Sequence, residues 1–395
     1  MSWPTRSLAE VAPIRSRKPE FFDGARRYYS TGAVGKSGEL DAPELVTFAE
    51  RPSRANSMPR IDDVGFARMN GTQKVVLISE AELGSLFSTG FCFLEPNETL
   101  DSKYLFYFLT SEGFQSEKNA LAGEGIMGGI KNSDVANMQI PLPLLSEQQR
   151  IVRLLDEAFE GIAIAKANAE KNLQNAYKLL NVYLASVFTN TKGDWDQKYL
   201  GDVCTFENGD RGENYPSASV RTPTGVPFIN AGHLTEGKVD FRSMDYIPKS
   251  RFDLLSNGKI RPGDILFCLR GSLGKFATVG DLSEGAIASS LVIIRTEKML
   301  LPEFLLGYLK SPLCAAMIQK HKGGTAQPNL SAASLRSFVM PLPRVSDQER
   351  IVDGVNLFSD AIDRLSEIYK TKASALSALE NSILNRSFAS DATAA

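Results

Sequence analysis

The chain has 395 residues, of which 43% are hydrophobic and 23% are charged, and its formal net charge is −2. This length and balance indicate about two folded domains and exclude a disordered or fibrous protein. No apolar run approaches the roughly 18 residues that span a bilayer, and the N-terminus lacks a signal-peptide pattern, so we expect a cytoplasmic protein without a membrane segment.

Residues 1–145 carry the pattern of an α+β module. Apolar or β-branched runs bounded by glycine and proline predict strands at residues 74–78 and 90–94, and a short helix is expected at residues 103–111. Two prolines in the Ile140–Pro143 stretch then end the β-like pattern. A long helix is expected to follow over residues 146–190, capped by its serine at the start.

This first long helix carries an apolar line whose members lie three and four residues apart, which is the spacing of a coiled-coil seam. The line comprises Ile151, Leu155, Ala158, Ile162, Ala165, Ala169, Leu173, Ala176 and Leu180. Some forty residues at about 1.5 Å each make a rod of about 60 Å, longer than a small domain is wide. The alternative is an amphipathic helix that packs only on its own module.

Residues 191–345 repeat the α+β pattern, and only this module has more Lys and Arg than Asp and Glu. Strands are expected at residues 226–229, 264–267 and 291–294, and a helix is expected at residues 302–310. A second long helix is expected at residues 346–390, followed by a tail at residues 391–395. Its apolar line comprises Ile351, Val355, Phe358, Ile362, Leu365, Tyr369, Ala373 and Leu376.

The two halves are copies of one another at an offset close to 200 residues. The sequence IPLP at residues 140–143 and SEQQRIV at 146–152 recurs as MPLP and SDQERIV 200 residues later, and residues 63–74 match residues 264–275. The second helix can bury its seam only by running back along the first. We therefore expect an α+β fold with two similar globular domains separated by two long helices, which form an antiparallel coiled coil with pseudo-two-fold symmetry.

Catalytic motifs were sought and none is convincing. Residues 30–37 (STGAVGKS) would resemble a phosphate-binding loop, but the preceding segment is polar and basic and no apolar strand is expected there. Only two histidines and four dispersed cysteines are present, so neither a metal site nor a Ser-His-Asp arrangement is expected, and the cysteines are expected to be buried apolar residues. Asp62 and Asp63 are interpreted as loop or cap residues. We expect a protein that is not an enzyme and holds no cofactor or metal.

The repeated Pro-Leu-Pro and Ser-Glu-Gln-Gln-Arg-Ile-Val blocks, each opening a long heptad helix after a glycine-punctuated module, closely resemble the specificity subunit of type I restriction-modification enzymes. Residues 264–267 (DILF), Arg270-Gly271 and Pro328-Asn329-Leu330 also look like that family's target recognition domains. Module 1 departs from them, because Gly65 replaces Leu266, Met69 replaces Arg270 and Gly128-Gly129 replaces Pro328-Asn329.

The resemblance implies a non-catalytic subunit. Residues 1–145 and 191–345 would be two target recognition domains, each reading one half of a bipartite double-stranded DNA target, and residues 146–190 and 346–390 would be helical spacers that also dock methyltransferase subunits. S-adenosylmethionine would then bind to the methyltransferase subunits, and ATP and Mg²⁺ to separate restriction subunits.

Reading a DNA sequence needs phosphate contacts for placement and side chains that match base edges. Polar loop candidates in module 1 are Arg26, Arg27, Tyr29, Ser30, Thr31, Lys36, Arg68, Lys74 and Lys131. Those in module 2 are Arg211, Asn230, His233, Arg270, Lys275, Gln327 and Asn329. Under the same resemblance, the candidates for docking partner subunits are Glu147, Gln148, Arg150, Asp347, Gln348 and Arg350.

Two other functions stay open at this point. The slightly negative net charge argues mildly against DNA binding, and a coiled-coil scaffold with peptide-binding modules would also fit the pattern. A stand-alone nuclease or methyltransferase is disfavoured by the missing motifs.

Overall fold

The computed structural model describes residues 3–36, 38–123, 128–189, 195–235, 237–324 and 328–388. The chain forms two compact units: unit 1 contains residues 1–170 and 370–395, and unit 2 contains residues 171–369. Both boundaries fall in the middle of a long helix. Each unit therefore contains a module, the beginning of one long helix and the end of the other.

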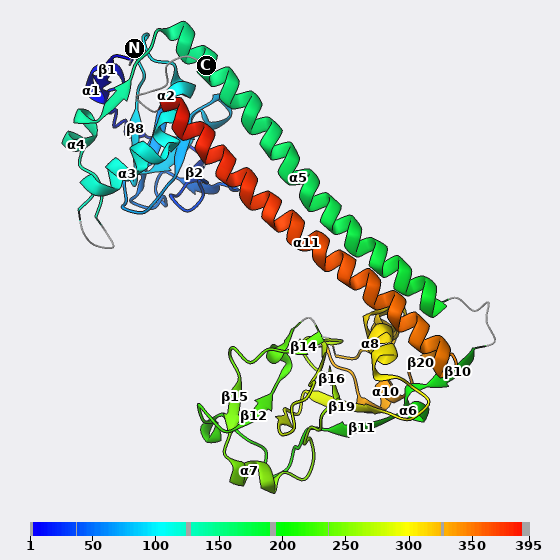
Figure 1. Cartoon of the computed structure of the whole chain (residues 1–395). Coiled ribbons are helices and arrows are strands. Elements are labelled where there is room, and N and C mark those ends of the chain that lie inside the picture. Colours follow the sequence, from blue (N-terminus) through cyan, green and yellow to red (C-terminus); the bar gives the residue numbers. More distant parts are fainter. Residues whose placement is uncertain are drawn as a thin grey trace. The chain divides into compact units, whose positions relative to one another are not determined.

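The described part of unit 1 has three small sheets, and Figure 1 labels one strand of each, β1, β2 and β8. Their orders are β1-β9, β3-β2-β7-β4 and β6-β5-β8. The strands are β1 (Thr5–Ser7), β2 (Ala25–Tyr29), β3 (Glu44–Thr47), β4 (Ala55–Ser57), β5 (Val64–Ala67), β6 (Val75–Leu77), β7 (Leu86–Ser88), β8 (Phe91–Leu94) and β9 (Gln139–Pro141). The helices are α1 (Leu8–Val11), η1 (Glu80–Glu82), α2 (Ser102–Thr110), α3 (Glu112–Leu121), α4 (Asn132–Asn137) and the first part of α5 (Leu145–Thr189).

Unit 2 also has three sheets, with the orders β10-β20, β11-β19-β16-β17-β14-β13 and β15-β12-β18. The strands are β10 (Asp196–Tyr199), β11 (Cys204–Asn208), β12 (Val226–Ile229), β13 (Leu234–Thr235), β14 (Gly237–Val239), β15 (Asp245–Ile247), β16 (Ile265–Cys268), β17 (Phe276–Thr278), β18 (Ala286–Ile287), β19 (Leu291–Thr296) and β20 (Val339–Leu342). The helices are α6 (Leu200–Val203), η2 (Ala218–Val220), η3 (Ala231–His233), α7 (Lys249–Leu254), α8 (Pro302–Lys310), α9 (Pro312–His321), α10 (Ala332–Arg336) and the first part of α11 (Val345–Phe388).

The two units share a core of equivalent strand pairings, as the duplication predicts, although the largest sheet of unit 2 carries three further strands, β11, β13 and β14. Strand β2 pairs antiparallel with β3 and parallel with β7, and β12 pairs in the same way with β15 and β18. Strand β5 lies between β6 and β8, as β16 lies between β17 and β19. The predicted strands and short helices are confirmed, whereas β2 was missed because its sequence ARRYY is polar and basic.

Gly65, which replaces Leu266 in module 1, has a packing reason. Gly65 pairs with Phe93 on β8, and Leu266 pairs with Ile293 on β19. A Cβ atom at Gly65 would overlap the Phe93 ring. One large and one minimal side chain therefore fill the space that two branched side chains fill in unit 2, because protein interiors are close-packed.

The long helices pack against each other in both units, with antiparallel direction. In unit 1, Lys166 on α5 forms an ion pair of 2.7 Å with Glu380 on α11. In unit 2, the ring of Tyr183 on α5 stacks on Phe358 of α11, with ring centroids 5.1 Å apart. A Cβ at position 354 would overlap the Tyr183 hydroxyl, which explains the glycine in the middle of this helix.

The last turn of each long helix completes the core of a module. In unit 1, the Phe388 ring lies 5.1 Å from Tyr104 and 5.7 Å from Phe108, centroid to centroid. In unit 2, the ring centroids of Phe188 and Phe304 are 5.2 Å apart. Positions 188 and 388 differ by 200, the offset of the repeat, so the two phenylalanines are equivalent. The helices therefore do not pack on their own modules alone, and the coiled-coil interpretation is confirmed within each unit.

Two details of the predicted helices are wrong. Leu365 is 38% exposed, and its neighbour Ser366, only 7% exposed, takes the buried place in the seam. The helices begin at Leu145 and Val345, so the two serines that were expected to cap them lie in the first turn. Within the described ranges, no helix is both long enough and apolar enough to cross a membrane.

Candidate nucleic-acid interface

The loop that connects β5 to β6, residues 68–74, gathers several predicted DNA-contacting residues of module 1. The Lys74 ammonium donates hydrogen bonds to the carbonyl oxygens of Thr31 at 2.7 Å and Gly32 at 3.1 Å. The Arg68 guanidinium donates to the carbonyl of Ile130 at 3.4 Å, next to the exposed Lys131. Arg68, Lys74, Lys131 and the half-buried turn at Ser30 and Thr31 therefore surround one loop.

Module 2 builds an equivalent loop between β16 and β17, at residues 269–275. Arg270 forms a β-bridge with Asn329, and Met69 forms the matching bridge with Gly129 in module 1. Arg270, Lys275 and Asn329 are all exposed. The structure thus brings together these three predicted residues, whereas Gln327, the remaining candidate here, lies outside the described residues.

Two predicted DNA-contacting residues are buried and do not lie on a surface. Tyr29 is 5% exposed, and its ring stacks on Phe87 with centroids 5.1 Å apart. His233 is 4% exposed: its Nδ1 accepts the backbone N–H of Asn230 at 3.1 Å, and its Nε2 lies 3.0 Å from the carbonyl of Ser243. Their rings complete the core and a turn, so the structure does not place these two side chains on an exposed loop surface.

The remaining candidates divide between local packing and open surface. The Asn230 side chain caps its own turn by accepting the N–H of Gly232 at 2.7 Å. Arg26 lies over the Phe22 ring at 4.4 Å, and Arg27 is half-buried on β2. Arg211, which donates to the Ser289 carbonyl at 3.3 Å, and Lys36 are exposed and free to meet a phosphate.

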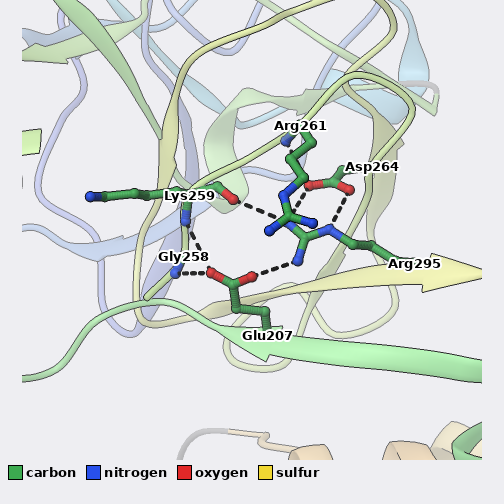
Figure 2. Close-up of polar contacts among 6 residues, drawn as sticks. All are labelled: Glu207, Gly258, Lys259, Arg261, Asp264 and Arg295. Carbon is green, nitrogen blue, oxygen red and sulfur yellow. Dashed lines mark hydrogen bonds and ion pairs between the residues drawn. The ribbon is translucent and has the colours of Figure 1, made fainter. Parts of the chain in front are cut away.

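A buried charge network holds the turn that leads into β16 of unit 2 (Figure 2). Arg295 on β19 donates to both carboxylate oxygens of the buried Asp264, at 2.7 and 2.8 Å, and also to Glu207 on β11. Its guanidinium also donates to the Lys259 carbonyl at 3.0 Å, and Glu207 accepts the N–H of Gly258 at 2.7 Å. These bonds fix the segment that precedes the Arg270 loop.

The charges shift the pKa values of the paired groups. Burial opposes ionisation of Glu207, but the hydrogen bonds from Arg295 and Gly258 outweigh it and lower the pKa of the carboxyl. Burial likewise opposes the charge on Arg295, yet Asp264 and Glu207 raise its pKa. Both side chains therefore stay charged at neutral pH.

Unit 1 has the same network with the charges exchanged between strands. The β-bridge between Ile14 and Leu94 corresponds to the pairing of Phe206 with Ile294. Arg15, which follows Ile14, is therefore equivalent to Glu207. Glu95, which follows Leu94, is equivalent to Arg295. Arg15 pairs with Glu95 at 2.6 Å, while Arg17 pairs with both Glu95 and the buried Asp63. Burial raises the pKa of Asp63 above its usual value. The sequence analysis missed this network, although the shared Asp63–Asp264 position in the repeat was the signal that could have revealed it.

Two of the predicted docking residues are buried. Gln148 is completely inaccessible: its side chain accepts the N–H of Asp101 at 2.9 Å and donates to the carbonyls of Thr99 and Pro143, both at 2.9 Å. Gln348 makes the equivalent three bonds to Leu301, Met299 and Pro343. These glutamines therefore join each long helix to its own module.

The other docking candidates lie on the surface. Glu147 and Arg150 form an ion pair of 2.8 Å, and Asp347 and Arg350 form one of 2.6 Å. The hydrogen bond from Arg150 lowers the pKa of Glu147 below its usual value. The four side chains remain available to a partner.

Replacement of Gln148 by leucine is expected to lower the free energy of unfolding by about 2–4 kcal/mol, because each buried polar group left unpaired costs about 1–3 kcal/mol. Arg150→Ala is the control and should change it by less than about 1 kcal/mol, as for other exposed ion pairs. Urea unfolding measures both variants. Equal effects of the two replacements would contradict the structural role of Gln148.

Among the residues that the structure describes, no group of three or more His, Cys, Asp or Glu side chains could hold a metal ion. The turn after β2 leads through the Val34–Leu40 bridge to β3, not into a helix, so it lacks the architecture of a phosphate-binding loop. All four cysteines are buried and unpaired, as predicted.

The sequence matches the family model of the type I restriction modification DNA specificity domain twice, over residues 2–175 and 192–373. The EcoKI specificity subunit of Escherichia coli strain K12 is 23% identical over 381 residues, which cover 91% of this chain and 81% of that subunit. The EcoBI specificity subunit of Escherichia coli is 23% identical over 334 residues, or 78% of this chain and 70% of that subunit.

Two solved structures have the same fold over nearly the whole chain. One comes from work on complex assembly and conformational transition of a type I R-M system; it has a TM-score of 0.78 and 24% identity, and the match covers 98% of this chain and 97% of that one. The other is the HsdS subunit of Thermoanaerobacter tengcongensis, with a TM-score of 0.59, 24% identity and coverage of 98% and 96%. The two matches to the domain family span most of the sequence, so the chain belongs to the type I restriction-modification DNA specificity family.

Proposed function

We propose that this chain is the DNA sequence-recognition subunit of a type I restriction-modification complex, and that each module reads one half of a bipartite target. The observation that carries the proposal is the duplicated loop. Residues 68–74 and 269–275 connect equivalent strands and make equivalent bridges, Met69–Gly129 and Arg270–Asn329. Two equivalent surfaces suit a ligand that is contacted at two similar places.

The charges around these loops suit a duplex. Phosphate contacts from lysine and arginine provide placement, and base-edge contacts provide specificity. Lys131 in module 1, and Arg270 and Lys275 in module 2, are exposed cations close to their loops. A chain with a net charge of −2 can therefore still present local positive surfaces to DNA.

Catalysis is assigned to partner subunits. Methyltransferase subunits would bind S-adenosylmethionine, and restriction subunits would use ATP and Mg²⁺; the complex would act in the cytoplasm. Each unit offers exposed apolar side chains on its long helices that suit contact with a partner: Leu145 and Leu154 in unit 1, and Leu179, Val182, Leu357 and Ile368 in unit 2. The exposed Glu147–Arg150 and Asp347–Arg350 pairs lie at the beginning of the same helices.

The test is DNA binding by the complex of this chain with its methyltransferase subunits, followed as the salt concentration rises. Six to ten phosphate contacts predict an affinity loss of about 10³–10⁵ between 50 and 200 mM salt, and unlabelled target DNA should compete better than unrelated DNA. A scaffold that binds peptides predicts neither result. Absence of salt-dependent binding would therefore favour that alternative.

A further inference from the structure

Lys118 on α3 is a completely buried lysine, and within the described ranges its ammonium contacts no carboxylate. Its ammonium donates to the carbonyl oxygens of Thr72 at 2.6 Å and Ala67 at 3.4 Å, and to the buried Gln115 amide oxygen at 2.8 Å. Burial lowers its pKa to about 8. Burial of the charge is costly, and the three hydrogen bonds offset part of that cost.

The two carbonyl groups lie at opposite ends of the β5–β6 loop. Ala67 is the last residue of β5, and Thr72 follows the tip of the loop. The tip is also held from outside: the N–H of Gly71 donates to the Asn119 side chain at 3.0 Å, and the N–H of Asn70 donates to the Gly128 carbonyl at 3.0 Å. Lys118 thus fixes the loop from the core side.

Module 2 does not fix its loop in this way. The residue equivalent to Lys118, 200 positions later, is Ile318, and a Cβ atom at Gly274 would lie 2.8 Å from its terminal methyl group. The caps that open the two helices, Ser111 and Ser311, show that α3 and α9 correspond. Unit 2 therefore uses an apolar contact where unit 1 uses a buried charge.

The loop tips differ at the surface as well. Module 1 exposes Asn70 and Gln73, and the equivalent residues of module 2 are Gly271 and Gly274. Asparagine and glutamine amides can form paired hydrogen bonds with the N6 and N7 edge of adenine. A glycine offers no side chain for such a contact.

We propose that the β5–β6 loop is a base-contacting site of module 1. The amides of Asn70 and Gln73 recognise a base edge in the major groove, and the base that their hydrogen-bonding groups match is adenine. Lys118 is the positioning residue that holds the loop for this contact. The inference rests on the proposed function and assigns a particular loop to recognition. Its two parts share one consequence, because changes at the amides and at Lys118 must affect the same half of the target.

The experiment compares the assembled complex carrying the wild-type chain, Lys118→Met, or the double variant N70A/Q73A. Competition binding uses duplex DNA with the bipartite target, defined by mapping methylated adenines, and two duplexes in which one half or the other is altered. Ile318→Met in module 2 is the matched control. Circular dichroism and the thermal midpoint of each variant establish that it is folded.

Both module 1 variants are expected to lose about tenfold in discrimination at the same half-site, with the other half unchanged; one well-made amide–base contact is worth at least about fivefold. Lys118→Met should lower the thermal midpoint, because the carbonyl oxygens of Thr72 and Ala67 and the Gln115 amide oxygen lose their donor. A lysine that serves stability alone would lower the midpoint and leave discrimination unaltered in the folded variant.

Unchanged discrimination in N70A/Q73A would overturn the proposal, and so would an equal loss at both half-sites. The double variant decides the question even where Lys118→Met does not fold, because both amides are exposed. A wild-type complex that cannot distinguish its target from altered DNA would instead refute the proposed function.

Discussion

Replacement of Arg295 by methionine is expected to lower the free energy of unfolding of the chain by about 3–5 kcal/mol, because removing one partner of a buried ion pair leaves the other charge unpaired. Asp264, whose side chain is 3% exposed, would lose both hydrogen bonds from the guanidinium. Urea unfolding monitored by tryptophan fluorescence and circular dichroism measures the change. Arg242→Met is the control, since the Arg242 side chain is 86% exposed in its pair with Asp240.

The exchanged arrangement in unit 1 allows a sharper version of this experiment. Unit 1 naturally carries arginine at the place of Glu207 and glutamate at the place of Arg295. The double variant E207R/R295E should therefore be more stable than the sum of the two single effects predicts, with a coupling of at least about 1 kcal/mol. Additive losses would show that the two charges do not act as a pair.

Insertion of four residues into each long helix, after Glu170 and after Tyr369, is expected to lengthen the gap between the two halves of the recognised DNA by about two base pairs. Four residues add about 6 Å of helix, and one base pair occupies about 3.4 Å along a duplex. Both α5 and α11 continue without a break from one unit into the other, so the insertion changes the length of chain that joins the units. Mapping methylated adenines by single-molecule sequencing measures the gap.

A single insertion is the control for the paired one. Lengthening only α5 shifts its seam against α11, so contacts such as Lys166–Glu380 and Tyr183–Phe358 cannot all form. This variant should lose stability, and we do not expect it to recognise DNA with a longer gap between the two halves of the target. A gap that stays the same after the paired insertion would contradict the role of the helices as a spacer.

The repeat and the helical spacing were enough to predict most of the architecture. Residues 140–152 and 340–352 predicted where the two long helices begin. Glycine-bounded runs predicted the ends of strands such as β12 and β19 to within one or two residues. The sequence could not show whether Leu365 or Ser366 is the buried residue of the seam. A residue three or four positions after Ile362 fits the coiled-coil spacing equally well. In the folded chain the Ser366 side chain is the buried one.

The site was predictable only in outline. Arg270 and Asn329 were identified from their resemblance to a known domain and do lie together. The burial of Tyr29 and Gln148 was not predicted, since the type of a residue does not reveal whether its neighbours in space bury it. Lys118 was missed because a lone lysine in a helix is usually solvated, and nothing nearby in sequence marks the carbonyl groups that hold it.

The most direct test of the central claim exchanges one module and maps the methylated DNA sites. Residues 1–145 are replaced by the corresponding module of another specificity subunit, and a glutamine at position 148 is kept so that it still joins the helix to the module. Independent reading predicts that one half of the target changes while the other half and the gap are preserved. A change in both halves would contradict the account.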